Sequence, residues 1–424
     1  MTVASLRALH DQAQALDAAD PLAALRSRFA VPHNAQGQPL TYLCGHSLGL
    51  MPLDTRRLID EELQDWAALG VDGHHRARRP WIDYAELLQQ GLARLAGAQP
   101  DEVVAMNSLT VNLHLMMASF YRPTGRRRLI VIEAGAFSSD RHAVSSQLAW
   151  HGLSVEDCLI EIAAPQGQDV IGTAALQQLL AQRGDEVALV LWPGVQYRTG
   201  EAFDLAAIAQ AARAAGACCG FDLAHAMGNV PLSLHDSGAD FAVWCGYKYL
   251  NGGPGALAGA FVHQRHARSD LPRLSGWWGH DPATRFQMAA QFTAAPGAAG
   301  WQISNPPILS ATPLLASLPL FEAAGATALQ AKTLSLGSLL LDALATHCAE
   351  TLQVITPSSR GCQLSLRVKA GRDTGLRVFD QLTGAGVVAD WREPDIIRVA
   401  PVPLYNTHQD VIQLVSALVA ALRT

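Results

Sequence analysis

Short, continuous apolar runs alternate with longer helical patterns through the middle of the chain. The runs cover residues 129–133, 187–192, 220–222, 241–244 and 259–262. Segments rich in alanine or leucine, such as 173–183 and 204–215, lie between several of these runs and are expected to be helical. Continuous apolar strands that alternate with helices predict an α/β fold whose mostly parallel sheet is buried on both faces.

The first hundred residues predict helices joined by loops. Residues 1–30 and 83–97 are expected to be helical, and residues 53–69 predict an amphipathic helix. A loop with glycines at both turns spans residues 42–50, and a polar, basic loop spans residues 70–81. The strand pattern begins only after this region.

A second, smaller α/β unit is predicted toward the C-terminal end. Long helices are expected over residues 310–348, and they are followed by a strand, a helix, a strand and a last helix, the first three at 363–368, 373–385 and 396–400. A chain of 424 residues is long enough for two domains. We therefore expect three parts, namely an N-terminal segment (1–50) that packs on the small domain, a large domain (51–310) and a small domain (311–424).

Composition and charge narrow the class of protein. Hydrophobic residues make up 49% of the chain and charged residues only 16%, which favours a compact, oligomeric protein with a sizeable core. The net charge of -6 gives no overall field that attracts nucleic acid. No uncharged apolar run approaches the roughly 20 residues that span a bilayer, so no membrane partner is expected.

The cysteines and the N-terminus bear on the compartment. The seven cysteines are odd in number and form no CxxC pair, which indicates small buried thiols in a reducing compartment rather than a disulfide framework. Residues 1–20 lack the uninterrupted apolar core of a signal peptide. We therefore expect a soluble, cytoplasmic protein.

Lys248 and Asp222 are the strongest candidates for chemistry. Lys248 ends an apolar run and precedes a glycine-rich turn, and Asp222 ends another apolar run 26 residues upstream. A buried lysine beside a buried aspartate is costly unless a ligand uses both groups. Pyridoxal phosphate uses both, because a lysine forms a Schiff base with its aldehyde and a carboxylate pairs with its pyridinium nitrogen. The alternatives are an exposed surface lysine and an ordinary helix cap.

Three other features of the sequence suit other parts of the same cofactor. Thr110 lies in a polar turn that opens a helix, where backbone N–H groups and hydroxyls bind a phosphate, although Ser108 or Thr110 as a simple N-cap is the alternative. Phe137 follows the apolar run 129–133 and can stack on the ring at the edge where open α/β sheets bind ligands; a core position is the alternative. His225 can hydrogen-bond the cofactor or its acid partner, and the alternative is a satisfied core histidine.

Two further motifs suit a substrate or an interface. Trp277 and Asn305 lie in segments that place tryptophan beside polar groups and prolines, which usually line a site or an interface rather than a plain core. Arg398 lies in an apolar strand and needs a partner. A substrate α-carboxylate bound by both arms of the guanidinium would supply one, and an internal Asp or Glu is the alternative.

Taken together, these motifs resemble the kynureninase family. The matching motifs run in order along nearly the whole chain, at residues 45–50, 79–81, 107–114, 221–229, 244–251, 304–307 and 398–405. The resemblance implies the aspartate-aminotransferase fold (fold type I, the fold of pyridoxal-phosphate-dependent transferases), with a seven-stranded, mostly parallel sheet in the large domain. It also implies pyridoxal 5'-phosphate as cofactor and a homodimer with shared active sites.

The resemblance further implies a hydrolase that cleaves a carbon–carbon bond. Its substrates would be L-kynurenine and 3-hydroxy-L-kynurenine, and its products L-alanine with anthranilate or 3-hydroxyanthranilate, in tryptophan catabolism and NAD biosynthesis. His74 and Asn305 form a polar pair that resembles family members preferring the 3-hydroxylated substrate, so we expect that preference here.

Roles for individual residues follow from the same resemblance. Lys248 is implied to carry the cofactor and remove the α-proton, and Tyr247 to act as acid and base at the substrate carbonyl. The implied cofactor-binding residues are Leu109, Thr110 and Tyr247 at the phosphate, Phe137, Ser138, Ser139 and Asp140 along the ring, Asp222 at its nitrogen, His225, and Trp277 and Asn305 from across the dimer interface. The implied substrate-binding residues are Ser47, His74, Asn305 and Arg398, and no metal ligand is expected.

The chain departs from the family pattern at two positions. Pro193 stands where many members carry a serine, and a proline donates no hydrogen bond. Gly246 replaces a small hydroxyl residue beside Tyr247. Each departure removes one minor contact to the cofactor.

Other classes of protein fit the sequence less well. A cysteine desulfurase would need a nucleophilic cysteine on a mobile loop, which neither Cys348 nor Cys362 provides. A zinc hydrolase would need ligand spacing that the histidines lack. A nicotinamide-dependent dehydrogenase would need a GxGxxG motif after the first strand, and a non-enzymatic binding module would not need Asp222 and Lys248 together.

Overall fold

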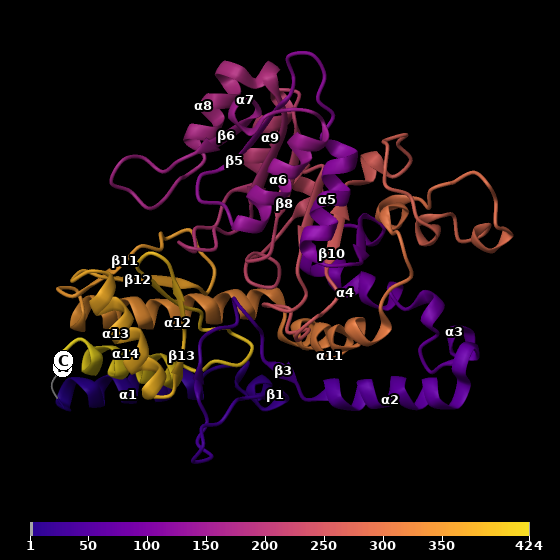
Figure 1. Cartoon of the computed structure of the whole chain (residues 1–424). Helices are drawn as coiled ribbons and strands as arrows, with labels where there is room; N and C mark the ends of the chain where they lie inside the picture. Colours follow the sequence, from indigo (N-terminus) through magenta and orange to yellow (C-terminus); the bar gives the residue numbers. More distant parts are fainter. Residues whose placement is uncertain (1–2, 424) are drawn as a thin grey trace.

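A seven-stranded sheet forms the centre of the larger part of the molecule (Figure 1). The computed structural model describes residues 3–423, with side chains from residue 6 onward. The strand order is β4 (Val103–Ala105), β10 (Gly259–Val262), β9 (Phe241–Trp244), β8 (Cys218–Asp222), β7 (Val187–Pro193), β5 (Leu129–Glu133) and β6 (Leu159–Ile162). Only β10 runs against the others. The predicted mostly parallel α/β sheet is therefore confirmed.

Helices surround this sheet and bury its strands. They are α5 (Leu109–Phe120), α6 (Ser138–Trp150), α7 (Val155–Cys158), α8 (Ala174–Arg183), α9 (Leu205–Ala214) and α10 (Leu234–Ser237). Every residue of β5, β9 and β10 is buried, which is why these strands read as continuous apolar runs. β4 has three residues and β6 is a half-exposed edge strand, so neither shows that pattern and both were missed from the sequence.

Helix ends follow local chemistry. α9 begins after Asp204, whose side chain accepts the backbone N–H of Ala207 at 3.0 Å. The last helix, α14 (His408–Ala421), begins with a capping box between Thr407 and Asp410. α4 (Glu86–Ala96) ends at Gly97, which adopts the left-handed conformation.

A smaller sheet lies beside the C-terminal helices. Its four antiparallel strands are β11 (Leu352–Val354), β12 (Leu364–Val368), β15 (Ile396–Val399) and β14 (Asp390–Arg392), in that order. It is accompanied by α12 (Ala326–His347), α13 (Arg372–Gly384) and α14. A second apolar core, separate from the core of the large sheet, joins these elements to α1 (Val3–Ala18).

The N-terminal segment contacts the C-terminal elements. In Figure 1, α1 lies alongside α14, and His408 Nδ1 lies 2.8 Å from a carboxylate oxygen of Asp17. Residues 19–30 do not continue the helix as the sequence predicted, because a 3₁₀ turn (Ala23–Arg28) and the short strand β1 (Phe29–Ala30) replace it. β1 pairs with β3 (Met51–Pro52), and β2 (Thr41–Tyr42) pairs with β13 (Val387–Val388).

Two consecutive helices, α11 (Ile308–Ala324) and α12, connect the two sheets and meet at an angle of 84°. α11 lies against α2 (Asp54–Leu69) and α4. The predicted loop at 70–81 contains a short helix, α3 (Gly73–Arg76). Within residues 3–423, no single helix is long and apolar enough to cross a membrane; α11 and α12 reach that length and composition only as this bent pair.

Candidate active site

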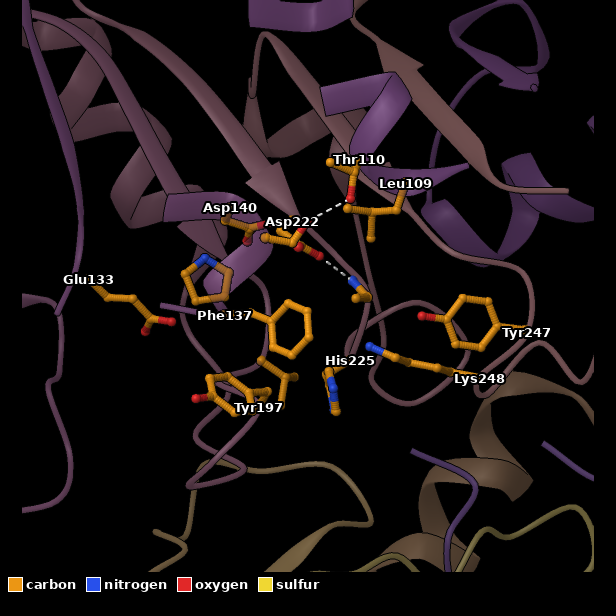
Figure 2. A pocket seen from close by; sticks show the side chains of 14 residues that line it. Leu109, Thr110, Glu133, Phe137, Asp140, Tyr197, Asp222, His225, Tyr247 and Lys248 are labelled. Atoms are coloured by element: carbon orange, nitrogen blue, oxygen red, sulfur yellow. Dashed lines mark hydrogen bonds between the residues drawn. The ribbon is translucent and has the colours of Figure 1, made fainter. Parts of the chain in front are cut away.

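A cavity lies where β5, β7 and β8 end, at Glu133, Pro193 and Asp222 (Figure 2). This is the edge at which open parallel sheets bind ligands. The lining residues are Leu109, Thr110, Glu133, Phe137, Ser139, Asp140, Pro193, Val195, Tyr197, Asp222, Ala224, His225, Tyr247 and Lys248. Nine residues predicted as site residues are therefore brought together here, and Ser138 stands next to one of them as the first residue of α6.

Lys248 reaches this cavity from the turn after β9. Its amine lies 5.8 Å from the ring centre of Phe137 and 5.9 Å from that of Tyr247, and Figure 2 shows it pointing between them. The turn is closed by the N–H of Asn251, which donates to the Lys248 carbonyl at 2.9 Å. Gly49 packs so closely on this turn that a side-chain carbon there would lie 2.3 Å from the same carbonyl oxygen. The lysine is thus held by close packing from the N-terminal segment.

Asp222 faces the same cavity as Lys248 without pairing with it. Asp222 as a whole residue is 8% exposed, and one oxygen of its carboxylate accepts the N–H of Ala224 at 2.6 Å. Across residues 6–423, neither Asp222 nor Lys248 takes part in an ion pair within 4.0 Å. The two opposite charges therefore flank a space instead of neutralising each other, which indicates a ligand between them.

Two further acids lie beside Asp222. Burial raises the pKa of Glu133 to about 8. Burial, together with the negative charge of Asp222, holds the pKa of Asp140 well above its usual range. One oxygen of Glu133 and one of Asp140 are buried and have no hydrogen-bond partner in the described part of the chain. Glu133 is therefore largely protonated at neutral pH, and burial beside Asp222 favours the protonated form of Asp140.

His225 is buried, but one of its ring nitrogens makes no hydrogen bond within the part of the chain that the structure describes. Its Nδ1 has no hydrogen-bond partner among residues 6–423. Burial, followed by the positive charge of Lys248, holds the pKa of His225 well below its usual range, so the ring is neutral. The alternative of a satisfied core histidine is therefore wrong, and the free ring nitrogen is available to a ligand.

The N-terminus of α5 forms an anion site. Ser108 precedes the helix but makes no side-chain cap hydrogen bond, so the first N–H groups of α5 stay free. The hydroxyls of Thr110 and Ser139 lie 2.7 Å apart beside these groups. Free backbone N–H groups, the helix dipole and two hydroxyls are the donors that a phosphate dianion prefers. The alternative of a simple N-cap at Ser108 is not what the structure shows.

Arg398 is already engaged by a carboxylate of the same chain. Its Nε donates to Asp390 at 2.7 Å, its Nη2 donates to the other oxygen of Asp390, and its Nη1 donates to the Tyr197 carbonyl at 2.6 Å. Asp390 also accepts the hydroxyl of Ser47 at 2.7 Å. The internal acid that the sequence left as an alternative is thus present, because the hairpin of β14 and β15 sets Asp390 directly opposite Arg398. Ser47 and Arg398 do not line the cavity themselves, but Arg398 contacts both Ser47 and the Tyr197 carbonyl beside it.

Three other predicted site residues lie outside the cavity. His74 packs edge-on against Trp81, with ring centres 5.5 Å apart. Trp277 is 48% exposed and contacts Phe286, and Asn305 is exposed. The single chain does not bring these three to Lys248.

The structure adds site residues that the sequence did not predict. Tyr197 packs edge-on against Phe137, at 5.4 Å between ring centres, and its carbonyl holds Arg398. Glu133 could have been found from its place as a single acid at the end of a buried apolar run. Asp390 gave no such signal, because its position depends on a strand pairing.

The two departures from the family pattern differ in their surroundings. Pro193 lines the cavity, so the missing donor lies at the site itself. Gly246 leaves no room for a side chain, since an added carbon would lie 2.2 Å from the Leu257 carbonyl oxygen. The absent hydroxyl at position 246 is therefore a consequence of close packing.

The Lys248 cavity can be compared with known proteins. The family model for aminotransferase class-V matches residues 42–369, and that for the kynureninase C-terminal domain matches residues 329–418. A kynureninase of Xanthomonas campestris pv. campestris (strain B100) is 58% identical over 95% of this chain and 96% of its own. A kynureninase of Xanthomonas euvesicatoria pv. vesicatoria (strain 85-10) is 56% identical over 96% and 98%. This chain belongs to the kynureninase family.

Membership of this family makes the protein a pyridoxal-phosphate-dependent hydrolase that acts on a carbon–carbon bond. The groups in the cavity fit that cofactor, with an amine, a facing carboxylate, an aromatic face and a phosphate-type anion site. The fold agrees with solved structures of pyridoxal-phosphate enzymes. The cysteine desulfurase CsdA from Escherichia coli matches with a TM-score of 0.75 and 18% identity over 95% of this chain and 98% of its own. The cystine C-S lyase C-DES matches with 0.76 and 18% over 90% and 97%.

Proposed function

We propose that this enzyme hydrolyses L-kynurenine and 3-hydroxy-L-kynurenine to L-alanine and anthranilate or 3-hydroxyanthranilate. The observation that carries the proposal is the unpaired Lys248 and Asp222 in one cavity of a chain 58% identical to a curated kynureninase. The reaction belongs to tryptophan catabolism and NAD biosynthesis. We assign it to the cytoplasm because all seven cysteines are free thiols.

Residues of the cavity would hold the cofactor at both ends. Thr110, Ser139 and the first N–H groups of α5 would bind its phosphate, and the Phe137 ring would cover one face. Asp222 would pair with the ring nitrogen, and Lys248 would be the amine that holds the aldehyde carbon. The bound cofactor supplies an electron sink, which lowers the cost of breaking bonds at the substrate α-carbon.

Lys248 and Tyr247 move the protons. When it is not bonded to the cofactor, the Lys248 amine would be the base that takes the substrate α-proton. Burial raises the pKa of Tyr247 to about 12, so its phenol is protonated at neutral pH and can donate a proton. We assign Tyr247 as the acid and base at the substrate carbonyl, where water must add before the carbon–carbon bond breaks. Each of these two groups contributes roughly 10²–10⁴ in rate.

Arg398 binds the substrate α-carboxylate by exchanging one carboxylate for another. In the structure its guanidinium already holds Asp390 with two donors, which is the geometry a free carboxylate needs. Substrate binding displaces Asp390 and leaves the Nη1 bond to the Tyr197 carbonyl in place. Ser47 donates to the incoming carboxylate in the place of Asp390.

A second copy of the chain completes the site. His74, Trp277 and Asn305 do not reach the cavity of their own chain. The segment 274–292, which contains Trp277, also carries exposed large apolar side chains, namely Leu274, Phe286, Met288 and Phe292. We propose a homodimer in which this segment and α3 of one subunit approach the Lys248 cavity of the other.

The substrate preference follows from His74 and Asn305. Two hydrogen-bonding side chains near the aromatic ring favour a substrate that carries a ring hydroxyl, because a site built to hydrogen-bond a hydroxyl rejects the analogue that lacks it. We therefore expect kcat/KM to be higher for 3-hydroxykynurenine than for kynurenine.

Turnover of both substrates, measured side by side, tests the function and the preference. Wild type with added cofactor should release the aromatic amine product from each substrate, and Lys248→Ala should release none. The double variant His74→Trp, Asn305→Thr should shift the kcat/KM ratio toward kynurenine. An unchanged ratio would refute the assigned preference, and no turnover of either substrate by a cofactor-loaded wild type would refute the function.

A further inference from the structure

A second cavity lies at the junction of α11 and α12 and shares no lining residue with the Lys248 cavity. Its volume is about 190 Å³. The helix axes bend by 84° there, around Gly325, whose φ of 74° lies in the left-handed region. The apolar part of the wall is formed by Leu95, Val230, Leu232, Phe321, Leu329 and Leu334. The cavity therefore lies at the bend that connects the two sheets.

One charged side chain in this wall lacks an ion-pair partner. Arg360 is half-buried, and burial lowers its pKa. Among residues 6–423 it forms no ion pair, and Nη1 donates only to the Gly361 carbonyl at 3.1 Å. Arg367 is similarly half-buried but pairs with both Asp169 and Asp395. Arg360 is thus a partly desolvated cation that faces a cavity without an anion.

The shape and the charge together define the ligand. We propose that this cavity binds a small monocarboxylate with an apolar or aromatic body, whose carboxylate pairs with Arg360. A cavity of about 150 Å³ holds benzene, so one ring with a carboxylate fits the available space. Leu334 is 53% exposed at the edge of the cavity, which leaves an apolar entrance. A neutral analogue leaves the guanidinium unpaired and binds more weakly.

The cavity wall also contacts the Lys248 site through Asn229. The Asn229 amide donates to the His225 carbonyl at 2.9 Å, and its oxygen accepts the N–H of Cys362 at 2.9 Å. Cys362 stands two residues after Arg360. A ligand bound to Arg360 would therefore shift residues 360–362 and, through Asn229, the turn that contains His225. We expect its binding to change turnover, and this second part depends on the proposed function.

Direct binding of benzoate tests the site without depending on turnover. Equilibrium dialysis of the cofactor-loaded enzyme should detect a benzoate site that Arg360→Gln weakens by about tenfold or more, since charge-assisted hydrogen bonds are the strong ones. Leu329→Trp, which fills the cavity, should weaken it similarly. Arg94→Gln is the matched control, because Arg94 also lines the cavity but is exposed and pairs with Glu322 at 2.9 Å. That variant should bind as wild type does.

Four results would overturn the proposal. The first is that wild type binds benzamide as tightly as benzoate, the second is that it binds neither, and the third is that Arg360→Gln and Leu329→Trp both leave benzoate binding unchanged. Each variant is first checked for an unaltered circular-dichroism spectrum and full cofactor loading. If Arg360→Gln does not fold, Leu329→Trp decides alone. Inhibition by benzoate that is purely competitive with substrate and persists in both variants would place the ligand at Arg398 instead and would equally overturn the proposal.

Discussion

At the residue scale, the surroundings of the three lysines separate them by role. Lys332 is 4% exposed and pairs with Asp20 at 2.7 Å, and Lys369 donates to the Ala349 carbonyl at 2.6 Å. Lys248 alone points into a cavity with no ion-pair partner among the described residues. An amine that is neither neutralised nor hydrogen-bonded to the chain is the one available for covalent chemistry.

The acids of the site mark the limit of prediction from sequence. Asp222 and Lys248 could be predicted, because each ends an apolar run and the chemistry needs both. Asp390 could not, because its importance comes from a strand pairing that sets it opposite Arg398. Glu133 could have been found as a single acid that ends an apolar run, but its raised pKa comes from burial in the folded chain, with Glu201 and Asp222 nearby.

A pH experiment tests the protonated state of Glu133. Because its pKa in the folded protein is about 8, against an ordinary value of 4.5, the native protein keeps a proton that the unfolded chain loses as the pH rises between these values. Wild type therefore loses stability through this group from about pH 4.5 to 8, by roughly a few kcal/mol in total. Glu133→Gln, which mimics the protonated acid, should not lose stability through this position as the pH rises.

Urea unfolding of both proteins without cofactor, at pH 5 and at pH 8, measures the effect. The free energy of unfolding of Glu133→Gln should equal that of wild type at pH 5 and should be larger than that of wild type at pH 8. A difference between the two proteins that stays the same at both pH values would show that Glu133 is ionised in the folded state.

At the element scale, burial on both faces decided which strands could be predicted. β5, β7, β9 and β10 are buried along almost their whole length, and their sequences are continuous apolar runs. The strands of two or three residues, such as β13 and β14, are too short to show a period, and their pairings depend on distant parts of the chain. The bend between α11 and α12 was likewise not evident from the helical pattern over 310–348.

The N-terminus of α5 provides a test at this scale. Thr110→Val removes the hydroxyl but keeps the shape of the side chain, so cofactor affinity should fall by about tenfold, the effect of losing a hydrogen bond to a charged group. Stability without cofactor should fall by only about 1 kcal/mol or less, because the hydroxyl contact with Ser139 is lost but no cap hydrogen bond is. The dissociation constant is measured by absorbance titration, and the melting temperature by circular dichroism.

Ser108→Ala is the matched control for Thr110→Val. Ser108 makes no side-chain cap hydrogen bond, so this variant should keep both its melting temperature and its cofactor affinity. If Ser108→Ala were instead destabilised by about 1 kcal/mol, the usual cost of losing a helix cap, the serine would be an ordinary N-cap. The proposed anion site at α5 would then lose its main support.

At the scale of the whole molecule, our proposal makes the site of one chain incomplete. The cavity contains most of the residues that we propose to bind the cofactor, whereas His74, Trp277 and Asn305 lie elsewhere on the chain. We keep the division into an N-terminal segment, a large domain and a small domain as a proposal, and the two separate apolar cores support it. The sequence could suggest a dimer through the exposed tryptophan motif, but not the distance of these residues from Lys248.

Subunit mixing tests the shared site. Lys248→Ala and the double variant His74→Ala, Asn305→Ala should each have little activity as homodimers. A mixed dimer has one cavity with Lys248 intact that faces intact His74 and Asn305 from the other subunit. Random mixing should therefore restore about a quarter of wild-type activity, because half the dimers are mixed and each has one complete site. Activity that does not rise on mixing would show that each chain uses its own His74 and Asn305.

The central claim, that Lys248 carries the cofactor, is tested most directly by trapping the linkage. Borohydride reduces a lysine–aldehyde linkage to a stable amine, and the modified peptide can be identified by mass spectrometry. The chain offers only Lys248, Lys332 and Lys369 as acceptors. The account predicts the mass of the cofactor on the peptide that contains Lys248, with loss of turnover in proportion to labelling. Label on Lys332 or Lys369, or loss of turnover without label on Lys248, would contradict it.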